Sequence, residues 1–502
     1  MRGPEKNRRR LTVGSVPQAA QTAQVPQTAQ APQTSQASET PQARRASKAR
    51  RASRVRRPSR VRQTSRARRV SLAPLVALVL LAAACLAGCG SSAAPVNVTA
   101  SGFGNNATGT VVFWARSNTI TAATPLVKEF NATHPHLKVV MDSIQDTQAV
   151  TELATAIRGH AAPDLVDLND IYMPIFTQLD AFMDLTKAVR GLPYAKHLSA
   201  GHLALATYGN RTYGVPYLAD ASVLWINKTL FKRAGLNPGD PPRNYAQILA
   251  DARKINALSH GIHGFSFAGD CSGCLGFTVL PNIWAAHSNV IRGPLDHQTA
   301  EVQGNKVVTS TLELYRKIWA EHLAPQSDLT DTGATWGLDF TGGKVGILPG
   351  GYGTVITQVP PSKRSQFADV PLPGPNGGFA TFDGGDDLAI PAGAKNPSGA
   401  WEFTKWLLQI KQQDQLPAFG YTPIRSDALT PAFQRANPLD AVALRALAHG
   451  VAPATTAYNS IFNQAGGPWL TMFDTAVFSG RAKAAMTAGQ QGFDQLLKDE
   501  AN

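Results

Sequence analysis

The sequence lacks the short motifs that mark several classes of enzyme and metal protein. It contains no H-E-x-x-H and no G-x-S-x-G segment, which excludes a zincin helix and a hydrolase nucleophile elbow. In the glycine-rich stretch 337–345, Gly343 stands where a phosphate loop has lysine, so this stretch cannot build that loop. We therefore expect neither an enzyme nor a protein that needs a cofactor.

Acidic residues are almost absent from the first 88 residues, where 18 Lys and Arg side chains accompany only Glu5 and Glu39. Since the whole chain has a formal charge of +14, the remainder 89–502 is close to neutral, at −2. Residues 1–70 consist largely of Pro-Gln and Arg-rich repeats with little apolar surface, which predicts a disordered leader. This leader could be a nucleic-acid-binding tail or an over-long export signal, but the near-neutral remainder predicts no nucleic-acid partner.

An uncharged apolar stretch, 71–88, follows the last arginine of the leader. A basic segment, an apolar segment and small residues in this order predict a secretory signal, with a permanent membrane anchor as the alternative. The stretch ends in Leu-Ala-Gly-Cys, which resembles a bacterial lipobox and implies that Cys89 is lipidated. Such a protein would be tethered to the outer face of the cell membrane, with 89–108 as a flexible tether.

Cysteine is scarce, with four residues in a chain of 502. Cys271 and Cys274 form a C-x-x-C pair, but a second such pair is missing, so the spacing predicts no zinc or other metal site. In an exported protein so close a pair is expected to form a local disulfide, and a redox site is the alternative.

Short apolar runs alternate with helical stretches beyond residue 108. The runs 111–115, 137–141 and 164–168 are separated by the helical stretches 125–130 and 151–158. This alternation is typical of an α/β fold with a largely parallel sheet. A later helix should begin after an Asn396 cap, and a last one should span about 481–499. Because a single core stops growing at about 250 to 300 residues, at least two lobes are expected.

Ten weak motifs follow one another in order from about residue 110 to about residue 480. They are 163–167, 213–217, 224–228, 231–236, 240–245, 340–347, 371–375, 384–386, 388–391 and 400–403. Taken together they resemble extracellular solute-binding protein family 1, the sugar-binding lipoproteins of ABC importers that include maltose-binding protein. Each motif alone is weak, but the shared order makes chance agreement improbable.

The resemblance implies a two-lobed periplasmic-binding-protein type II fold with central mixed sheets, a cleft between the lobes and hinge crossings near Ala219, Gly384 and 430–440. Residues 109–219 plus 384–432 would form lobe 1, and 220–383 plus 433–502 lobe 2. Such a protein would be a monomer that captures a carbohydrate or related solute and delivers it to the permease of an ABC importer. A solute that touches both lobes favours their closed arrangement.

Aromatic and polar side chains at predicted strand ends are the candidates for solute binding, because a sugar presents both hydroxyls and flat apolar faces. Open α/β sheets also bind ligands at strand ends. The resemblance assigns ligand positions to Asp220, Tyr352, Arg425 and Trp469, although Arg425 could form an interlobe salt bridge instead. The candidates are Trp114, Ser117, Asn118, Asn169, Asp170, Tyr217, Asp220, Trp284, Gly351, Tyr352, Gly385, Asp386, Arg425 and Trp469; for Trp114, Trp284 and Trp469 a place in the core is equally consistent.

Two other functions stay open. A secreted polysaccharide-active enzyme could use Asp386 and Asp387 as paired carboxylates, but adjacent residues of an extended strand point to opposite faces and do not easily flank one bond. A surface receptor without a transporter is the second. The sequence does not identify the solute: monosaccharide, oligosaccharide, polyol and glycerol phosphate all fit.

Overall fold

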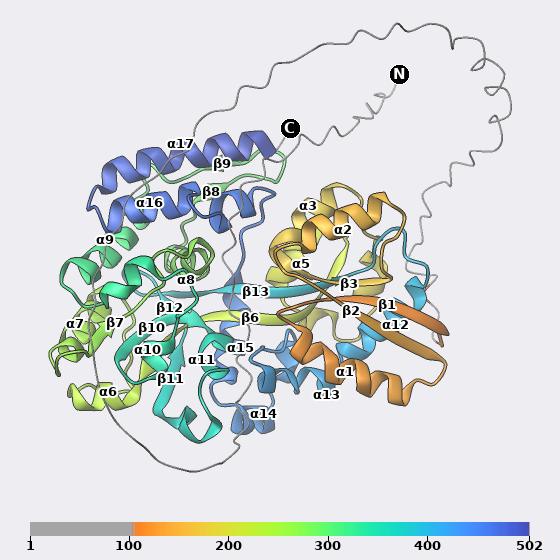
Figure 1. Ribbon diagram of the computed structural model, residues 1–502, viewed down its shortest axis with the longest axis horizontal. Helices are drawn as coiled ribbons and strands as arrows, with labels where there is room; N and C mark the ends of the chain where they lie inside the picture. Colours follow the sequence, from red (N-terminus) through yellow and green to blue (C-terminus); the bar gives the residue numbers. More distant parts are fainter. Residues whose placement is uncertain (1–102, 104–105, 501–502) are drawn as a thin grey trace, which may run out of the picture. The chain divides into compact units, whose positions relative to one another are not determined.

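The computed structural model describes residue 103 and residues 106–500 (Figure 1). The predicted leader 1–70, the apolar stretch 71–88 and Cys89 lie outside the described residues, as does most of the tether 89–108. Within the described part of the chain, no helix is long and apolar enough to cross a membrane, and no group of His, Cys, Asp and Glu is arranged to hold a metal ion.

A ten-stranded mixed sheet organises the described chain. Its main path runs β2-β1-β3-β13-β6-β10-β7, and β11, β12 and β14 pair at its sides. Strand β1 is parallel to β2 and β3, whereas β13 and β6 are antiparallel to each other and to their outer neighbours β3 and β10. The strands are β1 (Gly109–Arg116), β2 (Leu137–Ile144), β3 (Leu165–Asn169), β6 (Gly214–Asn227), β7 (His263–Phe265), β10 (Val345–Gly351), β11 (Phe367–Val370), β12 (Leu372–Pro373), β13 (Phe379–Ala389) and β14 (Gly450–Val451).

Strands β6 and β13 are long enough to take part in two different sets of pairings. Residues 214–221 of β6 pair with β13, and residues 222–227 pair with β10 and β11. Strand β13 pairs with β14 and β12 near its start and with β3 at its end. Figure 1 shows the two strands side by side between β1–β3 and β10–β12. Strand β6 is buried along nearly its whole length, so it is covered on both faces. A strand covered on both faces has a nearly continuous apolar sequence, as β6 does.

Helices cover the sheet on both sides of these two strands. Those that follow or pack near β1–β3 are α1 (Ile120–Thr133), α2 (Ala149–Arg158), α3 (Met173–Gln178), α4 (Thr186–Arg190), α5 (Ala200–Leu205), α12 (Pro397–Leu407) and α13 (Ile410–Gln413). The others are α6 (Lys228–Arg233), α7 (Tyr245–Asn256), α8 (Ser272–Trp284), α9 (Lys306–Ala320), α10 (Leu338–Thr341), α11 (Tyr352–Ile356), α14 (Pro431–Ala436), α15 (Asp440–Ala446), α16 (Pro468–Val477) and α17 (Ala482–Glu500).

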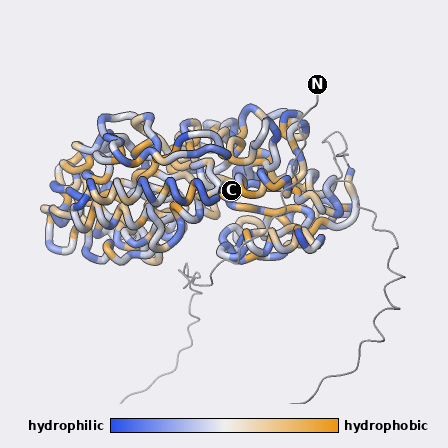
Figure 2. Tube along the Cα trace, turned by 90° about the horizontal axis from the view of Figure 1, so that it is seen from above, coloured by the Kyte–Doolittle hydropathy of each residue, from blue (hydrophilic) through white to orange (hydrophobic). Residues whose placement is uncertain are grey.

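Two large hydrophobic clusters and a smaller one hold these layers together. One is centred on α1, α12 and the β1–β6 region, and another on α7, α8, α9, α16 and α17. Hydrophilic and hydrophobic residues alternate along the helices in Figure 2. On α17 the buried Phe493 and Leu497 lie on one side, as expected for an amphipathic helix that lies on a core.

Several sequence predictions are confirmed. The three predicted apolar runs coincide with β1, β2 and β3, and the side chain of Asn396 accepts a hydrogen bond from the Gly399 N–H at the start of α12. The largely parallel sheet expected from the alternation of apolar and helical stretches is wrong, whereas the central mixed sheet implied by the family resemblance is confirmed. The sheet is mixed because β6 and β13 run in opposite directions through its centre.

Candidate functional site

A cavity of 310 Å³ lies where β6 and β13 pass each other. Its walls come from elements on both sides of these two strands. The loop after β1 and the end of β3 lie on one side, and the start of α8 and the segment around Tyr458 lie on the other. The lining residues are Arg116, Asn118, Thr119, Asn169, Asp170, Ile171, Leu218, Asp220, Gly273, Cys274, Phe277, Trp336, Phe382, Gly384, Gly385, Asp386, Tyr421, Tyr458 and Asn463.

Two glycines at the centre of β13, Gly384 and Gly385, line the cavity. Gly384 lies opposite Asp220 in the strand register, and a Cβ on Gly384 would lie 3.3 Å from the ring of Phe277. Gly385 has φ +134°, a value that side-chain-bearing residues rarely adopt. Without side chains at these two positions, the backbone itself forms part of the cavity wall.

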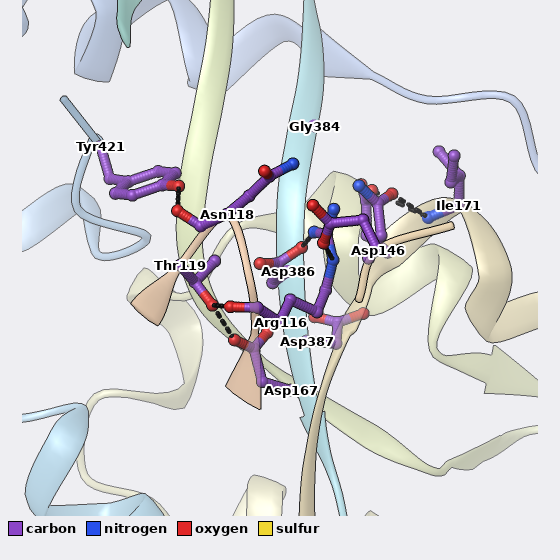
Figure 3. Close-up of polar contacts among 12 residues, drawn as sticks. Arg116, Asn118, Thr119, Asp146, Asp167, Ile171, Gly384, Asp386, Asp387 and Tyr421 are labelled. Carbon is purple, nitrogen blue, oxygen red and sulfur yellow. Dashed lines mark hydrogen bonds and ion pairs between the residues drawn. The ribbon is translucent and has the colours of Figure 1, made fainter. Parts of the chain in front are cut away.

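Arg116 fixes the loop after β1 to β13 (Figure 3). Its Nε donates to Asp146 Oδ1 at 2.8 Å, and its Nη1 donates to Asp386 Oδ1. Burial by itself would lower the pKa of Arg116, but Asp386 and Asp146 raise it above its ordinary value. The guanidinium is therefore permanently charged, and its charge is shared between two carboxylates.

Two acidic side chains of the cavity, Asp170 and Asp220, bind protons more tightly than exposed carboxylates do. Burial, assisted by the nearby Asp386, raises the pKa of Asp220 to about 7. Burial also raises the pKa of Asp170 well above its usual range, although His202 opposes that shift. Placing carboxylates out of contact with bulk water disfavours their charged form.

A buried histidine lies behind the cavity wall among three aspartates. His202 is on α5, and its Nε2 lies 3.1 Å from the carbonyl oxygen of Gly384 and 3.4 Å from Asp383 Oδ1. Its Nδ1 lies 3.5 Å from Asp387 Oδ1, and Asp170 is 3.8 Å from Nε2. Burial would lower the pKa of His202, but the aspartates, Asp383 foremost, raise it well above its ordinary value. The protonated ring offsets part of their charge.

Aromatic rings form the remaining wall. Phe277 and Phe382 have ring centroids 5.1 Å apart, and Tyr458 lies 6.4 Å from Phe382. The hydroxyl of Tyr421 donates to the carbonyl oxygen of Asn118 at 2.8 Å, which closes the side next to β1 (Figure 3). The indole N–H of Trp336, also on the wall, has no hydrogen-bond partner among the described residues.

Cys271 and Cys274 form a disulfide at the start of α8, with their Cα atoms 5.2 Å apart. Cys271 is the N-cap residue, and both Gly273 and Cys274 line the cavity. The loop at Gly333 lies directly over the two sulfurs, so that a Cβ there would come within 3.1 Å of both. The disulfide thus fixes the turn that forms one cavity wall.

The structure brings six of the fourteen predicted binding residues to the cavity. These are Asn118, Asn169, Asp170, Asp220, Gly385 and Asp386. Two more lie directly behind it: Ser117 donates to Asp146 at 3.2 Å, and a Cβ on Gly351 would lie 3.0 Å from Asp220 Oδ1.

The other six predicted residues lie away from the cavity lining. Tyr217, Tyr352 and Trp469 are buried members of the two large hydrophobic clusters. Trp114 packs beside α2 in the smaller cluster. Trp284 packs behind Phe382 with ring centroids 5.6 Å apart. Arg425 forms an ion pair with the adjacent Asp427 at 2.6 Å, and not an interlobe pair, and its guanidinium lies 3.8 Å above the ring of Tyr194.

Most of the aromatic wall and of the charged layer behind it was not predicted from the sequence. Arg116 ends β1 beside the predicted Ser117 and Asn118, and Tyr421 lies four residues before the predicted Arg425, so both could have been found. His202 and Asn463 carry no motif. Gly384, expected as a hinge crossing, also lines the cavity. The lining residues that were missed are Arg116, Thr119, Ile171, Leu218, Gly273, Phe277, Trp336, Phe382, Tyr421, Tyr458 and Asn463.

A second, larger groove of 1190 Å³ lies between residues 284–305 and 451–455. Its polar side chains largely satisfy one another: Arg292 pairs with Glu301 at 2.6 Å, and Gln298 donates to the carbonyl oxygen of Ala454 at 2.7 Å. It receives no lining residue from β1 or β3. The smaller cavity gathers charged and aromatic groups from both sides of β6 and β13, and it is the better candidate site.

Comparison with known proteins gives a consistent picture. A family model described as bacterial extracellular solute-binding protein matches residues 116–414. A lipoprotein from the region 5′ of oleD in Streptomyces antibioticus is 26% identical over 310 residues, which cover 60% of this chain and 66% of that protein. The sn-glycerol-3-phosphate-binding periplasmic protein UgpB of Brucella abortus is 29% identical over 223 residues, 42% of this chain and 48% of UgpB. The chain thus spans about two thirds or less of the length of these curated relatives.

Solved structures share the fold over more of the chain. The sugar-binding protein MalE of Xanthomonas citri superimposes with a TM-score of 0.69 at 21% identity, covering 78% of this chain and 98% of MalE. The GacH receptor of Streptomyces glaucescens, solved unliganded and with acarbose, gives a TM-score of 0.66 at 21% identity. The match covers 78% of this chain and 100% of GacH. At such identities the likeness shows the two-lobed α/β fold.

Proposed function

Because the chain belongs to the family of bacterial extracellular solute-binding proteins, we propose that it captures a carbohydrate or related small solute and delivers it to the permease of an ABC importer. The binding site is the cavity between β6 and β13. The protein acts outside the cytoplasm as a monomer held to the cell membrane by a lipid on Cys89. It requires no cofactor and no nucleic acid.

The observation that carries this proposal is the composition of the cavity wall. Carboxylates and amides alternate there with the rings of Phe277, Trp336, Phe382 and Tyr421. Hydroxyl-rich solutes are recognised by such a mixture, since polar groups fix their hydroxyls while rings cover their C–H faces. The wall also draws on both proposed lobes, 109–219 plus 384–432 and 220–383 plus 433–502. A bound solute would therefore favour the closed arrangement of the lobes.

The proposed location rests on the sequence and on one relative. The Leu-Ala-Gly-Cys segment that ends at Cys89 has the form of a lipidation site. The relative from Streptomyces antibioticus is named as a lipoprotein. A lipid-anchored protein of this family is suited to present its solute to a permease in the same membrane.

The geometry of β13 argues against the enzyme alternative. Asp386 is bonded to Arg116, whereas Asp387 lies beside His202. The two carboxylates are each engaged with a different cation, so they do not face one another across a bond of a substrate. We therefore propose binding without catalysis.

A thermal-shift screen of the full-length protein against mono- and oligosaccharides, polyols and glycerol phosphates tests the proposal. A solute at 100 times its Kd should stabilise the fold by about 2.7 kcal/mol. A hit whose effect is lost in Asn118→Ala plus Phe277→Ala supports the assignment of this cavity. If only amino acids or metal ions stabilise the protein, the carbohydrate assignment fails.

A further inference from the structure

Negative charge around the cavity exceeds the positive charge that faces it. Six carboxylates act on one another here, and a seventh, Asp146, shares Arg116 with Asp386. The six are Asp167, Asp170, Asp220, Asp383, Asp386 and Asp387. In the described part of the chain, the cations in contact with them are Arg116 and His202. Buried carboxylates are normally paired, so this surplus requires protons or a further cation.

Some of the carboxylates that make up this surplus of negative charge line the cavity. Asp170 and Asp386 line it while being 0% and 1% exposed, and each has a carboxylate oxygen without a hydrogen-bond partner among the described residues. One oxygen of Asp220, on the opposite strand, is likewise without a partner. Of the described residues that line the cavity, Arg116 alone is cationic, and its guanidinium is already bonded to Asp146 and Asp386.

We propose that the solute carries a protonated amino group beside its hydroxyls, as an amino sugar does. This inference rests on the proposed function. The amino group binds between Asp220 and Asp386. Asp386 already binds Arg116 through one oxygen, and Asp220 accepts a backbone hydrogen bond from Gly353. An ammonium group supplies donors for the second oxygen of each carboxylate and offsets the surplus negative charge. A neutral hydroxyl supplies donors only. A solute with a phosphate or carboxylate group would add negative charge to a cavity that already holds more carboxylates than cations, so the cavity disfavours anionic solutes.

Asp220 is the residue through which this preference should respond to pH. Its pKa of about 7 means that near neutrality a proton and a cationic solute compete for the same carboxylate. Asp386, Asp170, Arg116 and the phenol of Tyr421 are the other ionisable groups that face the cavity near it. Affinity for an amino sugar should therefore fall as the pH is lowered through 7, and binding near pH 7 should release protons.

Calorimetric titration of the full-length protein with matched sugars tests the inference. Each mono- and disaccharide is used in a neutral, an amino and a phosphorylated form, at pH 6 and pH 8; the amine is placed on the exocyclic primary carbon, where it stays protonated at both pH values. We expect the amino form to bind at least roughly 10-fold more tightly than the neutral form at pH 8, with the difference shrinking at pH 6, and the phosphorylated form to show no binding. Equal or tighter binding of a neutral or phosphorylated form would overturn the inference while leaving the proposed function intact. Failure of every form to bind would overturn both.

A matched pair of variants assigns the effect to the cavity. Asp220→Asn removes one charge while keeping the shape, so it should lower affinity for the amino form about 10-fold and leave the neutral form within roughly threefold. Asp296→Asn, at an exposed site outside the cavity, is the control and should change neither. Thermal melting of both variants verifies that they fold. A folded Asp220→Asn protein that keeps the full amino-sugar preference would contradict the role given to Asp220.

Discussion

Gly385 on β13 lies against the carbonyl oxygen of Leu218 on β6, so closely that a Cβ on Gly385 would sit 2.2 Å from that oxygen. The two strands that form the centre of the sheet therefore meet at a point where a side chain has no room. The glycine also has φ +134°, a backbone conformation that residues with a side chain rarely adopt.

Replacing Gly385 with alanine should destabilise the protein by about 3 kcal/mol or more, because strained backbone and a clash with neighbouring backbone are combined there. Gly393→Ala is the matched control, since a Cβ at Gly393 meets nothing within 4 Å. Urea unfolding of both variants gives the comparison. Equal stability of the two would show that β6 and β13 do not approach as described.

His202, behind the cavity wall, should contribute strongly to the free energy of unfolding. Its replacement by glutamine removes the cation that lies among Asp170, Asp383 and Asp387, and leaving buried carboxylates without their partner costs about 3–5 kcal/mol. His260→Gln, at an exposed site, should have little effect. Denaturant unfolding at pH 6.5 measures both.

The same residue predicts a pH dependence of folding. The pKa of His202 is raised above its ordinary value of 6.5, so its contribution to stability is complete below pH 6.5 and is lost as the pH rises through the folded-state pKa. The raised pKa values of Asp170, Asp383 and Asp387 act in the same direction, because these carboxylates ionise more readily once the chain unfolds. The unfolding free energy should fall from pH 6.5 to 9, and less steeply in the His202→Gln variant. A wild-type stability that rises over this range would exclude the charged histidine.

Trp336 should report solute binding. It is a partly buried tryptophan of the cavity wall, and Trp225 and Trp469 lie in the cores. Trp336→Phe should remove most of the fluorescence change on binding and weaken affinity by about 1 kcal/mol, roughly fivefold in Kd. Trp319→Phe on α9, outside the cavity lining, should retain both signals. A full fluorescence change in the Trp336 variant would place the solute elsewhere.

Loss of the disulfide should affect binding more than folding. The closed loop between Cys271 and Cys274 is very short, so the chain-entropy contribution to stability is only about 2 kcal/mol. Because Gly273 and Cys274 are part of the cavity wall, Cys271→Ser plus Cys274→Ser should nevertheless reduce solute affinity in calorimetric titration. Unchanged affinity in the folded double variant would show that the disulfide does not position the wall.

Local patterns predicted the framework of the fold well. The strands β1, β2 and β3 and the Asn396 cap of α12 depend on nearby residues, and periodicity and capping chemistry are visible in the sequence. The mixed direction of the sheet is not local. It depends on β13, more than 150 residues after β6, inserting between β3 and β6.

Polar site residues at strand ends were easier to predict than aromatic ones. Asn118, Asn169 and Asp170 reach the cavity because the ends of β1 and β3 meet at one edge. A tryptophan or tyrosine fits a core as well as a cleft, and only packing decides between them. Trp469 thus lies in a core, whereas Trp336, which no motif marks, reaches the cavity.

Hydrogen exchange in the presence and absence of the best solute from the thermal-shift screen tests most directly whether the cavity between β6 and β13 is the binding site. The account predicts slower amide exchange together in 116–119, 273–277 and 384–386, which come from both sides of the two strands. Protection confined to 284–305 and 451–455, the larger groove, would contradict it.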